Sequence, residues 1–550
     1  MKKRQLWVVA VVFAAALVAW YLLGRKRAPV DVPPPPPEPP VEAPKNLVAE
    51  AVVATPDATW RKAQTAVGGF LVLAPPTLGG VLAAYVGEPE LAASVDGSLP
   101  AYAALGEGDW VIAAHVASAS RARELLLGAE ASAPRFAPEA KSGALEILRP
   151  QSPSGAWIGL SRAFILVAPD RRSLEELGPY AYRTLPTKPP SSAAISATAT
   201  QAGLGGWLHA SLDRRWGSLR KYLLDKDDED RKAHGGRAPD FADPKGLVAA
   251  LQTVVDRHLG ALAAMKSAEA ILDIDDAAVT LRVDLTPLEG DNPAAHWLDE
   301  LHGGSTAPLA AQDADALFTL FWRTSAPERV ATAKDASGTL GETLGDRVPA
   351  AQRDELAALL LGAAEQRGDW ASVSFRGGAA TGVIMRLAAP DPKKLLPVVD
   401  KTFDLARKPG LGGWLRDALG VKSLTIDPHD FPGLGPGRRA HAAREGLQLD
   451  VGWLARSDEV DLGGGLDCDA LLASLAPARR YGDDPAVASA LNALGPEVAW
   501  ALVGRPLSQG ASPRSDAEVL ALAKDQGKAR LTFRTTGLLV RQLLASLDLP

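Results

Sequence analysis

Hydrophobic and polar residues follow two different spacings along this chain. From Val279 to Thr286, apolar and polar side chains alternate one by one, as in a β-strand with one buried and one wet face. From Gly246 to Ala264, apolar residues recur every three or four positions, which predicts an amphipathic helix. Short apolar runs predict strands at Phe70–Ala74, Trp110–Val116, Ala144–Leu148, Phe164–Ala168, Ala193–Thr198, Ala277–Leu285, Ala316–Trp322, Trp370–Phe375, Val383–Leu387, Leu447–Trp453, Val498–Val503 and Ala529–Phe533.

Helical patterns follow several of these strands directly. They lie at Ser120–Gly128, Arg171–Gly178, Pro392–Ala406, Ala470–Ala476 and Leu538–Leu547. Such an order predicts an α+β fold, in which repeated β-hairpin and helix units form mainly antiparallel sheets with helices on one face.

One hairpin-and-helix motif occurs more than once. A strand begins at Gly155–Trp157, and the returning strand ends in Ala168–Asp170 before a helix. The same order recurs between Gly368–Trp370 and Ala389–Asp391, and less clearly between Gly452 and Asp469. An aspartate at this place accepts a backbone N–H and caps the helix. The shared order favours a duplicated unit, and the alternative is chance similarity between loops rich in Gly, Ala and Pro.

The N-terminus carries a candidate membrane anchor. Leu6 to Leu23 is eighteen residues without a charge, just long enough to span a bilayer, with Trp7 and Trp20–Tyr21 near its two ends. The alternative is a cleaved signal peptide, but a cut at Ala14–Ala16 would leave an apolar stub. We therefore predict an uncleaved, single-pass transmembrane helix within residues 1–27, a signal-anchor.

A proline-rich stretch follows the candidate anchor. Pro29 to Pro44 cannot form a helix or a sheet and favours polyproline II, which gives a stalk of roughly 50 Å. The alternative is a proline-rich ligand for an SH3-like domain. Basic residues flank the anchor on both sides, at Lys2–Arg4 and Arg25–Arg27, but the short N-terminal tail favours a cytoplasmic N-terminus. We thus expect the inner (cytoplasmic) membrane, with the body periplasmic, outside the cytoplasm.

The remaining length predicts several domains. With 550 residues, the chain is too long for one core. We predict an anchor at 1–27, a proline-rich linker at 28–60, an α+β domain at 61–240, a second at 241–430 and a C-terminal α+β unit at 431–550. Lys226–Arg237 and Phe431–Arg439 are expected to be exposed, irregular stretches.

Charge and cysteine content exclude some partners. The formal net charge is −6, and the first 27 residues hold six of the 59 basic side chains and no acid. The body is therefore acidic, which argues against nucleic acid as a partner. Cys468 is the only cysteine, which excludes an intramolecular disulfide and a cysteine-ligated metal cluster. We expect a membrane contact through Leu6 to Leu23 and a protein or other envelope partner.

Two serines stand in motifs of known hydrolases. Ser218 and Lys221 match the S-x-x-K motif of penicillin-interacting enzymes, but the supporting S-D-N and K-T-G motifs are absent from the sequence. Ser161 approaches a nucleophile elbow, which requires a strand before the serine and a helix after it. Because strands are predicted on both sides of Ser161, a hairpin turn explains it better.

Histidines and acids offer weak candidates for a metal site. His296 and His302 are six residues apart, so they miss the i,i+4 spacing of a helical zinc pair. His258 lies near the apolar stripe of its helix. Asp427–Asp430, with His429, is expected in a loop, where simple turn chemistry explains it and a functional site is the minor alternative. Acids expected at a strand end and turn are Asp273, Asp275 and Asp276.

No catalytic, cofactor-binding or metal-ligating residue is predicted. The glycine clusters lack the context of a nucleotide-binding loop, and turns explain them: Gly203–Gly206, Gly410–Gly413 and Gly463–Gly465. The function expected is a non-enzymatic binding or scaffolding module. The alternative is an envelope hydrolase or transpeptidase-like enzyme. An enzyme needs a deep pocket with converging titratable groups, whereas a scaffold presents an extended sheet face or an apolar patch.

The order of anchor, stalk and repeated strand–helix units resembles membrane-anchored exoproteins of high-GC bacteria that contain domains of unknown function. Ala277–Pro287, Pro293–His302 and Leu309–Arg323 are similar to the junction between their repeats. The resemblance covers about half of the body and implies no active site.

Overall fold

The computed structural model describes residues 38–68, 72, 74–128, 135–153, 155–189, 193–233, 244–275, 278–378, 381–444, 447–476, 479–492, 494–495, 497–504 and 518–536. The predicted anchor at Leu6 to Leu23 and the predicted helix Leu538–Leu547 lie outside these residues. Within the described ranges, no helix combines the length and apolarity that a bilayer crossing needs.

The chain divides into two compact units. Unit 1 consists of Met1–Ser211, Leu262–Leu288 and Thr535–Pro550, and unit 2 consists of Leu212–Ala261 and Glu289–Arg534. The predicted domain boundaries at residues 240 and 430 stay predictions.

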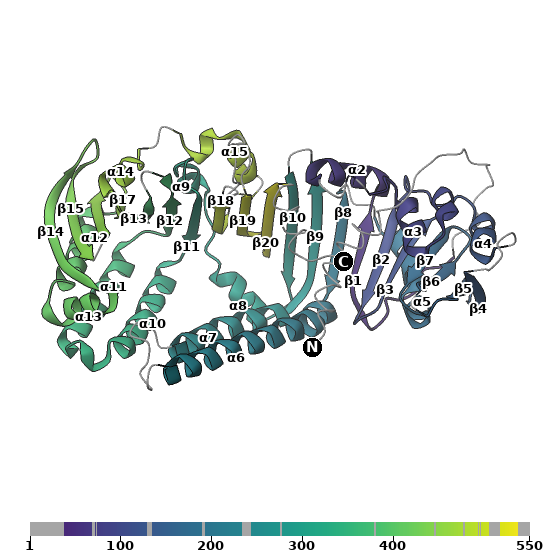
Figure 1. Cartoon of the computed structure of the whole chain (residues 1–550), viewed down its shortest axis with the longest axis horizontal. Coiled ribbons are helices and arrows are strands. Elements are labelled where there is room, and N and C mark those ends of the chain that lie inside the picture. Colours follow the sequence, from purple (N-terminus) through teal and green to yellow (C-terminus); the bar gives the residue numbers. More distant parts are fainter. Residues whose placement is uncertain are drawn as a thin grey trace. The chain divides into compact units, whose positions relative to one another are not determined.

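Unit 1 contains an antiparallel sheet. Its strands are β1 Leu47–Val53, β2 Ala101–Gly106, β3 Trp110–His115, β4 Phe136–Ser142, β5 Leu145–Pro150, β6 Trp157–Leu160, β7 Phe164–Ala168, β8 Ile195–Thr200, β9 Met265–Ile274 and β10 Ala278–Pro287. Their order across the sheet is β4-β5-β6-β7-β3-β2-β1-β8-β9-β10, and every pair is antiparallel. Figure 1 shows β10, β9, β8 and β1 side by side.

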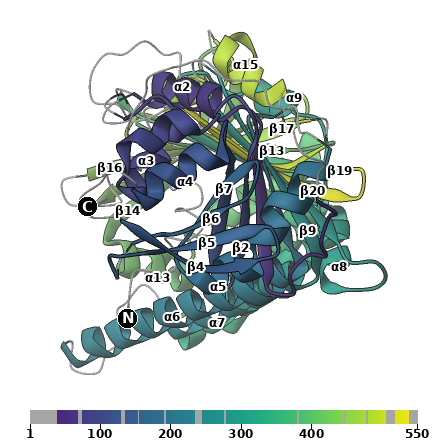
Figure 2. The same cartoon turned by 90° about the vertical axis from the view of Figure 1, so that its right-hand side faces the viewer.

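Helices cover both faces of the sheet in unit 1. They are α2 Pro56–Val67, α3 Leu78–Val86, η2 Pro89–Ser94, α4 Ala119–Leu127, α5 Arg171–Glu176, η3 Tyr180–Thr184, η4 Leu185–Thr187 and η5 Ala202–Leu208. On one face lie α3 and α4 (Figure 2), and their buried residues cluster with Ile158 and Val167. On the other, α5 and η3 pack on Leu166 and Ala168. The prediction of helices on one face is therefore wrong here, because β7 is apolar and buried along its whole length.

The strands of unit 2 are also paired antiparallel. They are β11 Phe318–Arg323, β12 Trp370–Arg376, β13 Gly382–Ala388, β14 Val421–Phe431, β15 Gly435–Arg444, β16 Leu447–Ala455, β17 Glu459–Gly465, β18 Val498–Gly504, β19 Glu518–Asp525 and β20 Lys528–Thr536. Their order is β14-β15-β16-β17-β13-β12-β11-β18-β19-β20, again antiparallel throughout.

The two strand orders are the same. Adding ten to each strand number of unit 1 gives the order in unit 2, so one ten-stranded topology occurs twice along the chain. The α+β class and the mainly antiparallel sheets that the sequence predicts are confirmed. Hairpin-then-helix segments occur where the motif was read, at β6–β7–α5, β12–β13–α12 and β16–β17–α14. By strand order, however, β6–β7 corresponds to β16–β17, the pair whose sequence match is weaker.

The remaining helices lie wholly or mostly in unit 2. They are α6 His209–Ala233, α7 Pro244–Ala263, α8 Pro293–Glu300, α9 Ala307–Ala310, α10 Ala326–Leu344, η6 Gly345–Arg347, α11 Ala350–Gln366, α12 Pro392–Leu405, α13 Pro409–Leu419, α14 Cys468–Ala473, η8 Tyr481–Asp483 and α15 Pro485–Asn492.

Several predicted irregular stretches are regular. Helix α6 continues through Lys226 to Ala233, because closely spaced acids and bases suit a solvent-exposed helix. Asp427–Asp430 lies in β14 instead of a loop. Pro428 is tolerated there because β14 is an edge strand and needs fewer N–H donors. In the predicted strand Phe70–Ala74, the described residues 72 and 74 are not in a strand.

The three glycine clusters are not turns. Gly203–Gly206 lies in η5, Gly410–Gly413 in α13 and Gly463–Gly465 in β17. A Cβ on Gly203 would come within 2.2 Å of the Val48 carbonyl oxygen. These glycines therefore permit close packing of one element on another.

Candidate apolar binding cavity

Unit 1 contains a cavity of about 410 Å³ between one face of its sheet and a layer of helices. The sheet wall comes from β1, β2, β3, β8, β9 and β10, and the opposite wall from α2, α3 and η5. The volume lies in the range of about 300–1,000 Å³ that small-molecule sites occupy.

Two rows of alanine side chains form the floor of the cavity. In one row across the sheet, Ala51 lies between Ala103 and Ala197, and Ala197 is paired in turn with Ala270. A parallel row holds Ala49, Ala199 and Ala268. These side chains are among those that line the cavity. Because alanine projects one carbon from the backbone, the two rows leave space beneath the helices.

Larger side chains beside this floor hold the helices away from the sheet. Ile195 and Leu272 are paired in the next row. They pack against Trp60 of α2 and Val81 of α3 in a buried cluster. The Trp60 indole N–H donates to the Pro75 carbonyl at 2.8 Å, which fixes the start of α3 relative to α2. The cavity thus has a rigid frame at one side.

Helix η5 forms part of the opposite wall. It is a π-helix, and it lines the cavity with Leu204, Trp207 and Leu208. The Gly203 N–H donates to the Thr200 hydroxyl at 3.1 Å, and that hydroxyl donates to the Leu47 carbonyl at 2.7 Å. Irregular helices of this kind are frequent at functional sites.

The lining is almost entirely apolar. Its polar side chains, apart from tryptophan, belong to Glu50, Thr59 and Tyr102. Strand alternation turns Glu50 to the opposite face, where its carboxylate accepts a hydrogen bond from the Tyr180 hydroxyl at 2.7 Å and pairs with Lys188. Tyr102 packs in the buried cluster of that opposite face as well. No charged side chain of the described lining therefore points into the cavity.

The serines singled out in the sequence lie away from it. Ser218 is exposed on α6, and its hydroxyl donates to the Arg214 carbonyl at 3.0 Å. Ser161 lies in the β6–β7 turn, as predicted, where its hydroxyl accepts a hydrogen bond from the Phe164 N–H at 3.0 Å. Neither serine has a general base within hydrogen-bonding distance among the described contacts.

The histidines are not brought together. His296 pairs with Asp291 at 2.6 Å, while His302 lies 3.8 Å from Asp369. A ring nitrogen of His258 is 2.7 Å from the Val254 carbonyl of its own helix. Each of the three therefore has local partners of its own.

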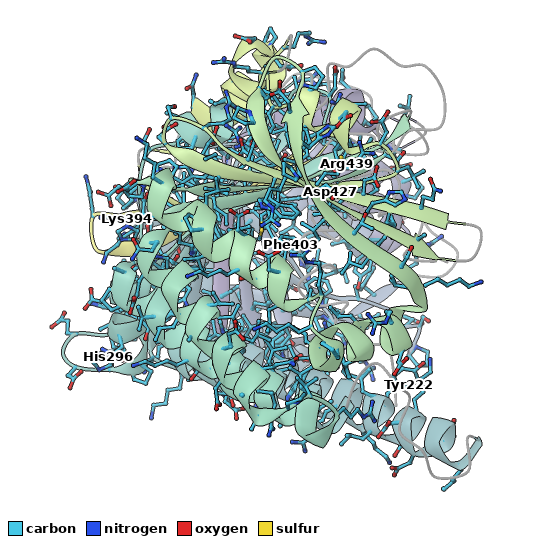
Figure 3. All side chains as sticks on the ribbon, turned by 90° about the vertical axis from the view of Figure 1, so that its left-hand side faces the viewer. Tyr222, His296, Lys394, Phe403, Asp427 and Arg439 are labelled. Atoms are coloured by element: carbon cyan, nitrogen blue, oxygen red, sulfur yellow. The ribbon has the colours of Figure 1, made fainter. Side chains whose placement is uncertain are left out.

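Asp427 and His429 lie two residues apart on one face of β14, and Asp430 lies on the other face. Nε2 of His429 is 2.9 Å from Asp469 of α14. Asp427 is exposed, opposite Arg439 on β15, and both are labelled in Figure 3. The acids and the histidine therefore do not converge on one point.

The other acids have structural partners. Asp275 accepts the Ala278 N–H at 2.6 Å in a turn, as predicted, and Asp273 is 3.6 Å from Arg282. Asp276 lies outside the described residues. Burial raises the pKa of the Cys468 thiol to about 12, so this thiol stays protonated. Across the described ranges, no group of three or more His, Cys, Asp and Glu side chains could hold a metal ion.

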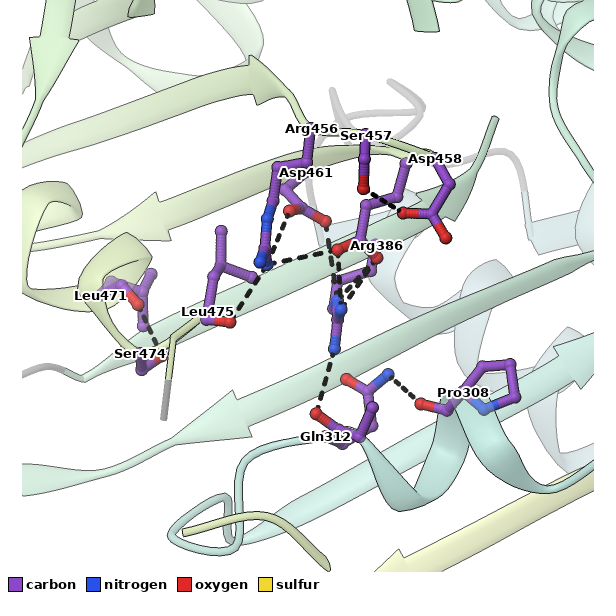
Figure 4. A network of polar contacts seen from close by, with 12 residues as sticks. Pro308, Gln312, Arg386, Arg456, Ser457, Asp458, Asp461, Leu471, Ser474 and Leu475 are labelled. Atoms are coloured by element: carbon purple, nitrogen blue, oxygen red, sulfur yellow. Dashed lines mark hydrogen bonds and ion pairs between the residues drawn. The ribbon is translucent and has the colours of Figure 1, made fainter. Parts of the chain in front are cut away.

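Charged groups do converge in unit 2, but inside the protein. Arg386 of β13 donates to both carboxylate oxygens of Glu459 at 2.8 Å, and Arg456 lies 3.2 Å from Glu459 (Figure 4). Asp461 is 0% exposed, lies 3.6 Å from Arg386 and accepts no hydrogen bond. Burial and the neighbouring Glu459 raise the pKa of Asp461 to about 7. Because Arg386, Glu459 and Asp461 are buried, this network is a structural feature of the core.

Sequence reasoning missed the cavity. The sequence pattern that accompanies the cavity is an alternation of alanine with polar residues, for example in Ser196–Thr200 and Ser267–Ala270. The alanines form a floor only once the register of four strands is known.

Comparison with known proteins gives no information about the function of this chain. No model of a known family matches the chain, and no curated protein matches it. Among solved structures, the chain is similar to one titled "Structure of crystal form III of TP0453", with 9% identity, a TM-score of 0.21, and coverage of 43% of this chain and 97% of that one. Crystal form IV of TP0453 gives 8% identity, a TM-score of 0.21 and coverage of 43% and 96%. Such TM-scores are too low to support an argument.

Proposed function

We propose that this chain is a non-enzymatic, membrane-anchored envelope protein in which unit 1 binds an apolar ligand, such as the acyl chain of a lipid. The observation that carries the proposal is the cavity of about 410 Å³, floored by alanine and lined by apolar side chains. Apolar surface removed from water contributes roughly 25 cal/mol per Å² to binding. A ligand with a long hydrocarbon chain gains the most from such a site.

The predicted anchor and stalk fit this proposal. Leu6 to Leu23 would hold the chain in the inner membrane, and the part of the proline-rich stretch before Glu38 would place the body outside the cytoplasm. Glu38 and Val41 are already hydrogen-bonded to unit 1 at Tyr182 and Thr184. A binding module tethered in this way has lipids within reach. A reporter fused after Pro550 tests the topology, and we expect it to be active only outside the cytoplasm. Cytoplasmic activity would overturn this location.

The alternative of an envelope hydrolase or transpeptidase-like enzyme has less support. Such an enzyme needs a nucleophile or an acid–base pair at a pocket. Among the described residues that line the cavity of unit 1, there is neither a nucleophile beside a base nor an acid–base pair. Ser218 lies on an exposed helix surface.

Photo-crosslinking tests the proposed ligand. A fatty acid bearing a diazirine would be added to membranes that hold the full chain, and the labelled peptides mapped by mass spectrometry. We expect labelling of peptides that contain Trp207 or Leu285, which line the cavity. The double variant Ala197→Leu, Ala270→Leu fills the floor and should reduce this labelling more than tenfold.

The control is Ala358→Leu, which adds the same side chain at an exposed position of α11. It should label like the wild type. Circular dichroism and a melting curve would establish that all variants are folded. Equal labelling of the filled variant and the wild type would contradict the proposal.

A further inference from the structure

A second cavity lies within unit 2 and has a different character. Its volume is about 680 Å³. It lies where β11 leads into α10, where α11 leads into β12, and where β13 leads into α12. Charged side chains line it, in contrast to the apolar cavity of unit 1.

Two arginines stand at the inner wall of this cavity. Arg329 of α10 is only 8% exposed, and its guanidinium donates to the Ala364 carbonyl at 3.1 Å and to the Thr324 carbonyl at 2.8 Å. Arg367 donates to the Thr324 hydroxyl at 2.9 Å. All of these acceptors are neutral. Burial, followed by the charge of Arg329, lowers the pKa of Arg367 to about 10.

Four acids also line the cavity, and two of them, Asp369 and Asp391, form ion pairs with other bases; the four are Glu365, Asp369, Asp391 and Asp458. Asp369 forms an ion pair with Arg323, a third arginine, and lies 3.8 Å from His302. Asp391 pairs with Lys394 at 3.5 Å, at the rim and start of α12 (Figure 3 labels Lys394). Among the described residues, no carboxylate lies within 4.0 Å of Arg329 or Arg367. In addition, Nε of Arg323 is buried without a hydrogen-bond partner.

Buried guanidinium groups without a counter-charge are unfavourable. An ion taken out of water is stabilised only when an opposite charge or strong acceptors replace its hydration. Here Asp369 and Glu328 act on Arg329, and Glu328 acts on Arg367, without forming a direct ion pair with them. Both guanidiniums border an open cavity, so a solvent anion can supply a direct partner. Guanidinium is planar and donates in pairs, which suits the oxygens of phosphate and related groups.

We propose that this cavity binds a small oxyanion, namely a phosphate group, between Arg329 and Arg367. The phosphate would come from a free phosphate ion or from the head group of a lipid. This inference is independent of the apolar cavity in unit 1, since it uses other residues and another kind of ligand.

The test is calorimetric titration of the full chain in detergent with inorganic phosphate, at constant ionic strength against chloride. We expect saturable binding by the wild type. Arg367→Gln removes one guanidinium at a half-buried position and should weaken binding at least tenfold. Arg367→Lys keeps the charge without the planar donor and should restore part of the affinity.

The matched control is Arg407→Gln, because Arg407 is an exposed arginine paired with Asp404 outside the cavity. It should bind phosphate like the wild type. A parallel titration with glycerol 3-phosphate separates the two sources: tighter binding than phosphate indicates a lipid head group, and equal binding indicates free phosphate. The proposal is overturned if the wild type shows no saturable binding, or if Arg367→Gln, with an unchanged melting temperature, binds equally well.

Discussion

The two units share a strand order but differ in the side chains on corresponding faces of their sheets. In unit 1, the row Ala103–Ala51–Ala197–Ala270 lies across β2, β1, β8 and β9. In unit 2, the corresponding row across β12, β11, β18 and β19 is Val373–Leu320–Leu502–Leu520. Small residues leave a roofed cavity in unit 1, whereas Leu320 and Leu502 are 40% and 38% exposed in unit 2. One topology therefore gives two different surfaces through side-chain volume.

The opposite face differs in charge. Ala113 of β3 is paired with Leu166 of β7 in unit 1, and both are fully buried. The corresponding pair in unit 2 is Arg386 with Asp461, which is also buried. The buried contacts of this pair are apolar in unit 1, whereas the pair in unit 2 belongs to an ion network.

The largest expected effect concerns this network. Arg386→Ala leaves Glu459 and Asp461 without their main counter-charge, which should destabilise unit 2 by about 3–5 kcal/mol. Hydrogen exchange measured by mass spectrometry should show faster exchange in peptides of β12 and β13. Arg407→Ala, at an exposed ion pair, serves as the control and should change exchange little. A loss below about 1 kcal/mol would mean that the network is not what holds unit 2 together.

A second comparison contrasts packed and hollow parts of unit 1. Leu166→Ala removes a fully buried side chain and should destabilise the unit by about 2–5 kcal/mol. Leu285→Ala removes a partly buried side chain at the cavity and should cost about 1 kcal/mol. Denaturant unfolding of the two variants measures the difference. Equal losses in the free energy of unfolding for the two variants would show that the cavity beside Leu285 is closed in solution.

The third effect depends on pH. The folded state holds the proton of Asp461 up to about pH 7, whereas an unfolded aspartate releases it near 3.8. Protonation therefore favours the folded state, with the full effect below pH 3.8, and this stabilisation is lost as pH rises towards and through 7. The stability of the wild type should fall relative to Asp461→Asn between pH 4 and 8. Parallel curves for the two proteins would contradict the raised pKa.

The smallest effect concerns the open face of unit 2. Leu320→Asn replaces a side chain that is already 40% exposed, so the loss in stability should be about 1 kcal/mol or less. The same change should reduce binding of the dye 8-anilinonaphthalene-1-sulfonate, which reports exposed apolar surface. Unchanged dye fluorescence would show that this face is covered in solution.

Local pattern predicted much of the fold. β7 was predicted at the bounds that the structure shows, Phe164–Ala168, because its apolar run is closed by Pro169 and Asp170. The edge strands β4 and β14 were missed because each contains a proline, Pro138 and Pro428. In an edge strand, the N–H that proline lacks need not pair with another strand. The sequence of one segment does not show whether it will lie at an edge of the sheet.

The sites needed information from distant strands. Ala51 and Ala270 meet in one row through β8, which lies far from both in sequence. Arg386 meets Asp461 through strand pairing in the same way. Neither the alanines nor the charged pair stands out in its own segment of sequence. The sequence alone therefore predicts a binding module but not the residues of its binding site.

The place of β1 in its sheet has a consequence for how the chain folds. Ala49 of β1 pairs with Leu105 of β2 on one side and with Ala199 of β8 on the other. The pairing of this central strand is therefore incomplete until β8 has been synthesised. In the second copy, Thr319 likewise pairs with Ser374 and then with Val503. Such distant pairings slow folding, and until they form, the free strand edge can join another chain. A chain truncated between the second and eighth strands of either copy should therefore aggregate.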